Sequence, residues 1–157
     1  MIKVLFVCLG NICRSPMAEA IFNARVRELG LENELSSDSC GTANYHIGSQ
    51  PDQRTVNVVK GHHMPINHFC RQLTRNDIDD FDYIMAMDAS NYQNILFFAR
   101  GGNEHKVLMM RSFDSQSVEE EVPDPYYGSI KDFQEVFEIL DQCISGFIDH
   151  LREKHSL

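Results

Sequence analysis

The chain has 157 residues, 43% of them hydrophobic, which is enough for one domain around a single core. Its 14 basic and 23 acidic residues give a formal net charge of −9 without a long basic run, which argues against a nucleic-acid partner. No stretch reaches the ~20 apolar residues of a membrane span, and the first residues lack the pattern of a signal peptide. The five cysteines follow no regular disulfide framework, which favours a reducing compartment. We therefore expect one cytoplasmic domain over residues 1–157. We also expect a monomer or weak dimer, which these features do not determine.

The first predicted strand, residues 3–7, leads directly into the segment Cys8-Leu9-Gly10-Asn11-Ile12-Cys13-Arg14-Ser15. A turn between a strand and a helix gathers backbone N–H groups into an anion site, and the helix dipole adds positive potential there. We expect Cys8 to lie beneath the anion as a thiolate, stabilised by the helix N-terminus and the Arg14 guanidinium. Because the planar fork of arginine matches two oxygens of one anion, the segment indicates a phosphate or arsenate site.

Several residues of this segment have expected structural roles. Gly10 is expected to adopt a positive φ, and Asn11 tolerates the same region while its side chain ties the loop to another segment. Ser15 is a suitable N-cap, and Pro16 fits the first turn of the following helix, where its missing N–H costs nothing. The Ser15 hydroxyl is also a candidate hydrogen-bond donor to the Cys8 thiolate.

Other interpretations of the same residues are weaker. A cysteine near the end of a buried strand is usually a small core residue, but the spacing of Cys8 to Arg14 argues against that. A metal site built from Cys8 and Cys13 lacks the two-residue spacing and second ligand pair usual for zinc. A nucleotide-binding P-loop needs a lysine where Arg14 stands. We therefore expect no metal at this loop.

Strand and helix patterns alternate along the rest of the chain. Strands are predicted at residues 3–7, 34–39, 83–87 and 106–109. Helices are predicted at residues 17–29, 52–62, 89–98 and 129–153, the last with one long apolar stripe. This alternation implies an α/β fold in which helices cover both faces of a parallel sheet and ligands bind at the carboxyl ends of the strands. Cys8 follows the first strand at such an end.

A second motif precedes the last predicted helix. Expelling an alkoxide or phenolate from phosphorus requires a proton donor, and Asp124 lies between Pro123 and Pro125 on a stiff segment that supplies a carboxyl group. On its own, an aspartate between prolines is more typical of a turn. Tyr126 and Tyr127 follow it and are suited to stacking against an aromatic ring.

The segment from Val7 to Pro16 resembles the signature of the low-molecular-weight protein tyrosine phosphatases. Other segments occur in the order of that family: Asp38-Ser39, residues 45–48, residues 68–72, residues 87–91 and residues 124–128. The resemblance therefore covers essentially the whole chain. It implies a single-domain, doubly wound, four-stranded parallel sheet with helices on both faces.

The resemblance also implies an activity. Such an enzyme hydrolyses phosphotyrosine in proteins, and small aryl phosphates, through a phosphocysteine on Cys8, without metal or organic cofactor. Asp124 is implied as general acid in the first step and general base in the second. Because Cys8 must be ionised while Asp124 is protonated, we expect a rate profile that favours mildly acidic pH. Relatives that act on phosphoarginine carry a small polar residue such as threonine at position 12, so Ile12 favours phosphotyrosine.

Further roles come from the same resemblance. The phosphate-binding loop comprises Leu9, Gly10, Asn11, Ile12, Cys13, Arg14 and Ser15. Substrate contacts are expected from Tyr45, Tyr126 and Tyr127, with Leu9 and Ile12 lining the slot. His68 is expected to brace Asn11, with Asp88 and Ser39 in the same network, and Cys13 is expected to protect oxidised Cys8 as a disulfide. His46, His62, His63 and His105 are assigned no chemical role, although His46 lies beside Tyr45 in a segment expected at the rim.

Two other functions remain open from the sequence. An arsenate reductase on this scaffold needs further redox cysteines on a mobile segment, and Cys40, Cys70 and Cys143 stand far apart in the sequence. A phosphate-binding adaptor without turnover would normally lack the nucleophile, the arginine or the acid, and Cys8, Arg14 and Asp124 are all present.

Overall fold

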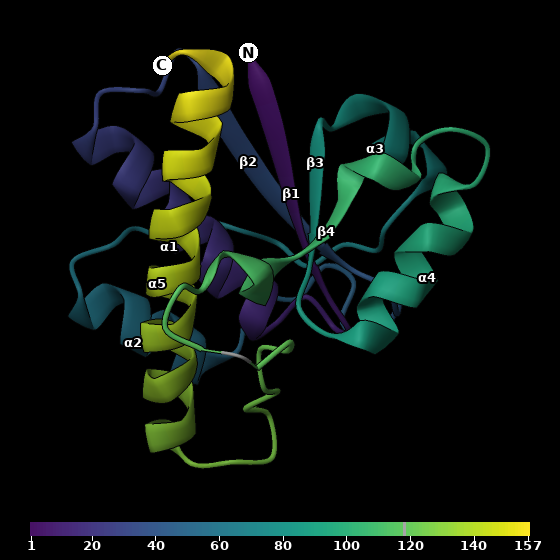
Figure 1. Ribbon diagram of the computed structural model, residues 1–157. Coiled ribbons are helices and arrows are strands. Elements are labelled where there is room, and N and C mark those ends of the chain that lie inside the picture. The colour runs from purple at the N-terminus through teal and green to yellow at the C-terminus, as the bar shows by residue number, and fades with distance from the viewer. Residues whose placement is uncertain (118) are drawn as a thin grey trace.

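The computed structural model describes residues 1–117 and 119–157. Its four-stranded sheet has the order β2-β1-β3-β4, and every pairing is parallel. The strands are β1 (Ile2–Cys8), β2 (Leu35–Gly41), β3 (Tyr83–Ala86) and β4 (Val107–Met109). The chain leaves β1 for β2 on one side and then crosses to β3 on the other, so the order reverses beside β1 (Figure 1). This parallel order confirms the predicted doubly wound α/β fold. In such sheets, ligands bind where the strand order reverses.

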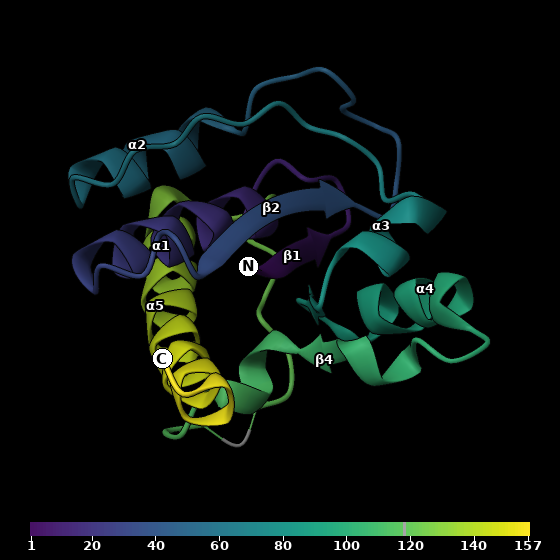
Figure 2. The same cartoon turned by 90° about the horizontal axis from the view of Figure 1, so that it is seen from above.

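The helices divide between the two faces of the sheet (Figure 2). One side carries α1 (Arg14–Glu28), α2 (Gln53–Gly61) and α5 (Ile130–His155). The other carries α3 (Arg75–Asp80) and α4 (Ala89–Ala99). Strand β1 is buried on both faces because alternate side chains enter different cores: Val4 and Phe6 join the α1 and α5 side, while Leu5 and Val7 join the α3 and α4 side.

The helices differ from the sequence-based expectation in two places. Helix α3 was not predicted, because six residues are too few to show an apolar period. It begins with a capping box in which Thr74 and Asp77 exchange hydrogen bonds. The prediction that Ser15 caps α1 is wrong: the helix begins at Arg14, after Cys13, so Ser15 lies inside the first turn with its hydroxyl free for other partners.

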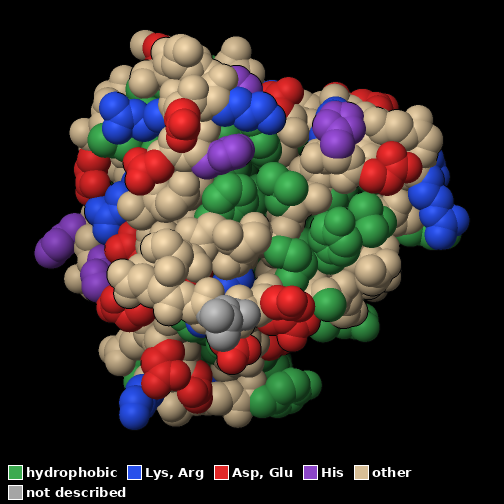
Figure 3. Space-filling view, viewed as in Figure 1, with side chains coloured by type: hydrophobic (Ala, Val, Ile, Leu, Met, Phe, Trp, Pro, Cys, Tyr) green, Lys and Arg blue, Asp and Glu red, His purple; other side chains and the backbone are tan. Residues whose placement is uncertain are grey.

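The remaining surface features concern charge and the ends of the chain. Figure 3 shows acidic side chains scattered over one face, around apolar side chains that gather between α5 and α4. Both termini lie at the amino end of the strands, away from the edge where β1 leads into α1 (Figure 1). Within the described residues, no helix is long and apolar enough to cross a membrane.

Candidate active site

The loop after β1 is held against the segment that follows β2. The amide of Thr42 donates to the Cys8 carbonyl at 2.9 Å, and the amide of Ala43 donates to the Leu9 carbonyl at 2.9 Å. Gly41 permits this approach, because a Cβ there would lie 2.6 Å from the Leu9 carbonyl oxygen and 3.0 Å from the Asn11 nitrogen. Gly41 was not predicted from the sequence, where its only signal is a glycine two residues beyond the predicted strand 34–39.

Asn11, rather than Gly10, carries the strained conformation of the loop. The expected positive φ at Gly10 is wrong, and Asn11 adopts a φ of 58° with its side chain fully buried. Left-handed backbone is disfavoured for residues with a Cβ, and asparagine tolerates it best. The conformation is therefore stabilised by what the Asn11 side chain binds.

Four hydrogen bonds hold the side-chain amide group of Asn11. Its Nδ2 donates to Ser15 Oγ at 2.8 Å and to Ser39 Oγ at 3.0 Å. Its Oδ1 accepts from His68 Nε2 at 2.7 Å and from the Arg71 backbone N–H at 3.0 Å. The structure thus brings the expected partners Ser39 and His68 to Asn11, and adds the backbone of Arg71.

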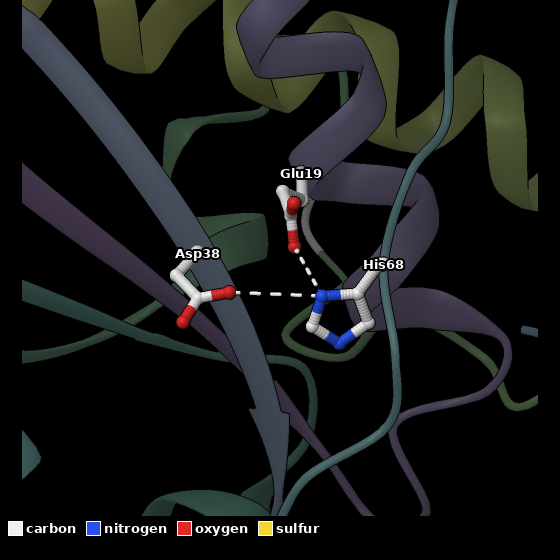
Figure 4. A group of neighbouring side chains, drawn as sticks. All are labelled: Glu19, Asp38 and His68. Carbon is white, nitrogen blue, oxygen red and sulfur yellow. Dashed lines mark ion pairs between the residues drawn. The ribbon is translucent and has the colours of Figure 1, made fainter. Parts of the chain in front are cut away.

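Behind this amide, His68 faces two carboxylates (Figure 4). Its Nδ1 lies 3.2 Å from Glu19 Oε1 and 3.6 Å from Asp38 Oδ1, and its side chain is almost completely buried. Since Nε2 donates to Asn11, a proton is needed between Nδ1 and Glu19. Burial raises the pKa of Glu19 to about 7 and lowers that of His68, so Glu19 is the natural holder of that proton.

The three side chains could in principle hold a metal, since their ligand atoms lie within 4.8 Å of one another. However, other protein groups already bind both carboxylates. Ser39 Oγ donates to Glu19 Oε1 at 2.7 Å, and Arg71 Nε donates to Asp38 Oδ2 at 3.0 Å. We therefore assign the cluster to bracing the loop. Glu19 was missed by the sequence analysis because it lies on the predicted helix without any local motif.

At the floor of the site, the Cys8 thiol is almost completely buried and lies 3.0 Å from Ser15 Oγ. The Ser15 hydroxyl accepts from Asn11 and is therefore left with its own proton to donate. It can give that proton to a thiolate at Cys8 or to the Cys40 carbonyl, 3.3 Å away. Because Ser15 lies inside the first turn of α1 rather than at its N-cap, its hydroxyl is near the Cys8 sulfur.

Arg14 connects this floor with the second motif. Its side chain is 3% exposed, and its Nη1 donates to Asp88 Oδ2 at 2.8 Å and to the Val122 carbonyl at 3.0 Å. Its Nη2 lies 3.7 Å from Asp124 Oδ2. Burial opposes the charge of Arg14, but the neighbouring Cys8 and Asp88 outweigh it and raise the pKa of the guanidinium. Asp88 caps α4, so that helix also fixes the arginine.

Together these groups enclose one cleft of about 240 Å³. Its lining comprises Cys8, Leu9, Gly10, Ile12, Cys13, Arg14, Tyr45, His46, Asp124, Tyr126 and Tyr127. All the predicted catalytic and substrate-contacting residues are therefore brought together, and His46 lines the cleft although the sequence gave it no chemical role. The Tyr126 and Tyr127 rings meet edge to face at 4.9 Å, but Tyr127 is 96% exposed and lies at the mouth.

The remaining cysteines are free and buried. Cys13 lies in the loop, and burial raises the pKa of its thiol far above the usual value. Cys70, missed by the sequence analysis, donates from Sγ to the Asn11 carbonyl at 2.9 Å, so a segment remote in sequence also supports the loop. Burial raises the pKa of Cys70 to about 11, which leaves it protonated for this hydrogen bond.

A buried thiol, an arginine and a carboxylic acid around one anion cleft on this α/β scaffold define a cysteine-dependent phosphatase. The family model described as "Low molecular weight phosphotyrosine protein phosphatase" matches residues 3–157. The chain belongs to this family and is a cysteine-dependent hydrolase.

Individual relatives agree with this assignment. The low molecular weight phosphotyrosine protein phosphatase of Schizosaccharomyces pombe is 46% identical over 137 residues, covering 87% of this chain and 88% of the relative. The Homo sapiens protein of the same name is 39% identical over 152 residues, covering 94% of each. Among solved structures, a protein tyrosine phosphatase from Entamoeba histolytica has a TM-score of 0.95 at 39% identity over 99% of each chain. A Drosophila arginine phosphatase has a TM-score of 0.90 at 32% identity, over 96% of this chain and 98% of that one.

Proposed function

We propose that this phosphatase removes phosphate from tyrosine side chains of proteins, with Cys8 as nucleophile, Arg14 as phosphate-binding residue and Asp124 as general acid and base. The observation that carries the proposal is the convergence of these three side chains on one cleft, from opposite ends of the chain. The loop amides and Arg14 supply positive potential where the phosphate oxygens would bind.

In the first step, the Cys8 thiolate attacks phosphorus, so that an S–P bond forms as the P–O bond to the phenol breaks. Asp124 donates its proton to the departing phenolate oxygen, which leaves the carboxylate ionised. The loop and Arg14 stabilise the transferring phosphoryl group by positioning and charge.

In the second step, the ionised Asp124 takes a proton from water as that water attacks phosphorus. A new P–O bond forms, the S–P bond breaks, and inorganic phosphate leaves. Cys8 departs as a thiolate, which the Ser15 hydroxyl stabilises with a hydrogen bond from 3.0 Å away. Asp124 is protonated again, so both catalytic groups return to their starting states.

The walls of the cleft favour an aromatic substrate. Ile12 and Tyr126 both line it, and apolar and aromatic surface is suited to a phenyl ring above a bound phosphate. A structural neighbour is named an arginine phosphatase, and phosphoarginine is therefore the second substrate to test. A guanidinium group would meet apolar Ile12 without a hydrogen-bond partner there.

The direct experiment measures hydrolysis of para-nitrophenyl phosphate, a phosphotyrosyl peptide and a phosphoarginyl peptide by the wild type, Cys8→Ser and Asp124→Ala. We expect Cys8→Ser to abolish turnover and Asp124→Ala to slow it about 10²-fold or more. Unchanged activity in Cys8→Ser would overturn the mechanism. Faster hydrolysis of the phosphoarginyl peptide by the wild type would overturn the substrate assignment.

We also propose that Cys13 protects Cys8 from irreversible oxidation by trapping it as a disulfide. Both thiols lie in the same loop and line the same cleft, which supports the pairing. Mass spectrometry after mild peroxide treatment should show a Cys8 to Cys13 link. Overoxidised Cys8 beside free Cys13 would contradict it.

The organisation of the whole protein is part of the proposal. One domain over residues 1–157 is supported by a single sheet with helical layers on both faces. Five buried free thiols support the cytoplasm as its location. Light scattering over a range of concentrations tests the proposed monomer or weak dimer.

A further inference from the structure

We propose that Arg54 is a positioning residue for the general acid, and that it works by tying the segment of Asp124 to the phosphate-binding loop. This inference rests on the proposed role of Asp124. It concerns a side chain outside both motifs, near the start of α2, whose contacts reach both halves of the site.

The start of α2 is fixed to the phosphate-binding loop. The backbone N–H of Asp52, the N-cap of α2, donates to the Ile12 carbonyl at 2.8 Å. The hydroxyl of Thr55, which is fully buried, donates to the Cys13 carbonyl at 3.3 Å. A side chain on this first turn therefore has a fixed position relative to the phosphate-binding loop.

Arg54 is locked in place on that turn. Its Nε and Nη2 make a bidentate pair with the Asp52 carboxylate at 3.0 and 2.9 Å. Its guanidinium also lies 4.3 Å from the centre of the Phe133 ring of α5. Because a bidentate pair and a stacked ring fix the plane of the guanidinium, its remaining N–H groups point in set directions.

Those N–H groups reach the acid loop, residues 122–128. Nη2 donates to the Tyr126 carbonyl at 3.0 Å and Nη1 donates to the Gly128 carbonyl at 3.2 Å. The N–H of the same Tyr126 donates to Asp124 Oδ1 at 3.1 Å. The backbone of Tyr126 therefore connects the Arg54 guanidinium to the Asp124 carboxyl group.

The other end of the acid loop is anchored independently. The N–H of Val122 donates to the Met87 carbonyl at 2.8 Å, and its carbonyl accepts from Arg14. Loss of Arg54 would release the downstream half of the loop, from Asp124 to Gly128, while the upstream anchor and the phosphate-binding loop stay in place. The expected defect is a displaced acid rather than a damaged nucleophile.

The experiment compares kcat/KM for two aryl phosphates whose leaving groups differ in their need for a proton. Para-nitrophenolate leaves readily without one, whereas phenolate from phenyl phosphate depends on the acid. For Arg54→Met, which keeps an unbranched side chain without the fork, we expect kcat/KM on phenyl phosphate to fall about tenfold further than on para-nitrophenyl phosphate. In an Asp124→Ala background, the same substitution should no longer change the ratio between the substrates.

The matched control is Arg25→Met. Arg25 has the same 32% side-chain exposure and a comparable bidentate pair, with Asp141 at 2.9 Å, but joins α1 to α5 away from the cleft. Arg25→Met should leave kcat/KM unchanged on both para-nitrophenyl phosphate and phenyl phosphate. Circular dichroism checks folding, and Arg54→Lys replaces Arg54→Met if that variant does not fold, since lysine keeps the charge but cannot bind Asp52 and Tyr126 together.

Equal losses on both substrates, or a further change of the ratio in the Asp124→Ala background, would overturn the role of Arg54. Failure of the underlying mechanism has a different signature. If Asp124→Ala alone leaves the ratio at its wild-type value, Asp124 is not the acid.

Discussion

Gly41 is the residue whose substitution tests the packing of the phosphate-binding loop most directly. A methyl group there meets three backbone atoms, the Leu9 oxygen, the Asn11 nitrogen and the Gly10 carbonyl carbon, none of which can rotate away. We expect Gly41→Ala to destabilise the fold by about 1–3 kcal/mol and to weaken inhibition by inorganic phosphate. Urea denaturation and the inhibition constant measure the two effects. Gly61→Ala is the control, because a Cβ at the end of α2 meets nothing within 4 Å.

Glu19 is one buried residue through which pH acts on stability. Its pKa of about 7 in the folded protein lies above the ordinary 4.5, so the folded state binds the extra proton and stability from this group is lost as pH rises from about 4.5 to 7. The lowered pKa of His68 acts in the opposite direction. Between pH 5 and pH 7, Glu19 should therefore lower the free energy of unfolding of the wild type by about 2 kcal/mol. Glu19→Gln should lack this loss.

Urea denaturation at the two pH values measures this difference. Glu153→Gln, at an exposed position of α5, should retain the wild-type dependence. An unchanged dependence in Glu19→Gln would show that the buried carboxyl group does not hold the proton facing His68.

At this scale, the sequence predicted residues whose chemistry is distinctive and missed those defined by distant neighbours. Cys8, Arg14 and Asp124, the proposed nucleophile, anion-binding group and acid, could be picked out because they belong to recognisable motifs, and the structure brings them to one cleft. Gly41 and Arg54 act through backbone atoms far away in the chain, and no local pattern reports such contacts. The positive φ expected at Gly10 is found in the phosphate-binding loop only at Asn11 for the same reason, since partners on β2 and residues 68–71 stabilise the asparagine.

Among the elements of residues 1–117 and 119–157, the four strands and four of the five α-helices were predicted close to their observed positions. Helix α3 was missed because an apolar period needs more than its six residues. Its capping box was nevertheless legible as a threonine followed three residues later by an aspartate. Asp77 of that box also pairs with Arg71, so the short helix supports a segment that contacts Asn11.

Thr74→Ala tests the stability contribution of this cap. It removes a side-chain acceptor from the first turn of α3, and we expect a loss of about 1 kcal/mol in the free energy of unfolding. Urea denaturation measures it, with Ser90→Ala, at an exposed position of α4, as the control. Equal stability of the two variants would show that the cap adds nothing to α3.

On the scale of the whole molecule, the fold brings the loop of Cys8 and the loop of Asp124 together at one cleft, and the proposed activity depends on both. The proposed mechanism needs Cys8 ionised and Asp124 protonated, so kcat/KM should fall on both sides of a mildly acidic maximum. In Asp124→Asn the alkaline fall should disappear. Asp149→Asn, at an exposed position of α5, should keep the wild-type profile. A profile of wild-type shape in Asp124→Asn would assign the alkaline fall to another group.

The placement of the acid near α5 has a consequence for the order in which the enzyme is made. The thiol and its arginine leave the ribosome more than a hundred residues before Asp124. Helix α5, whose Phe133 lies against the Arg54 guanidinium, follows Asp124 in the chain and packs on α1 later still, through its apolar stripe. A nascent chain can therefore expose its reactive sulfur before it is able to turn over a substrate, and oxidants meet that sulfur during translation.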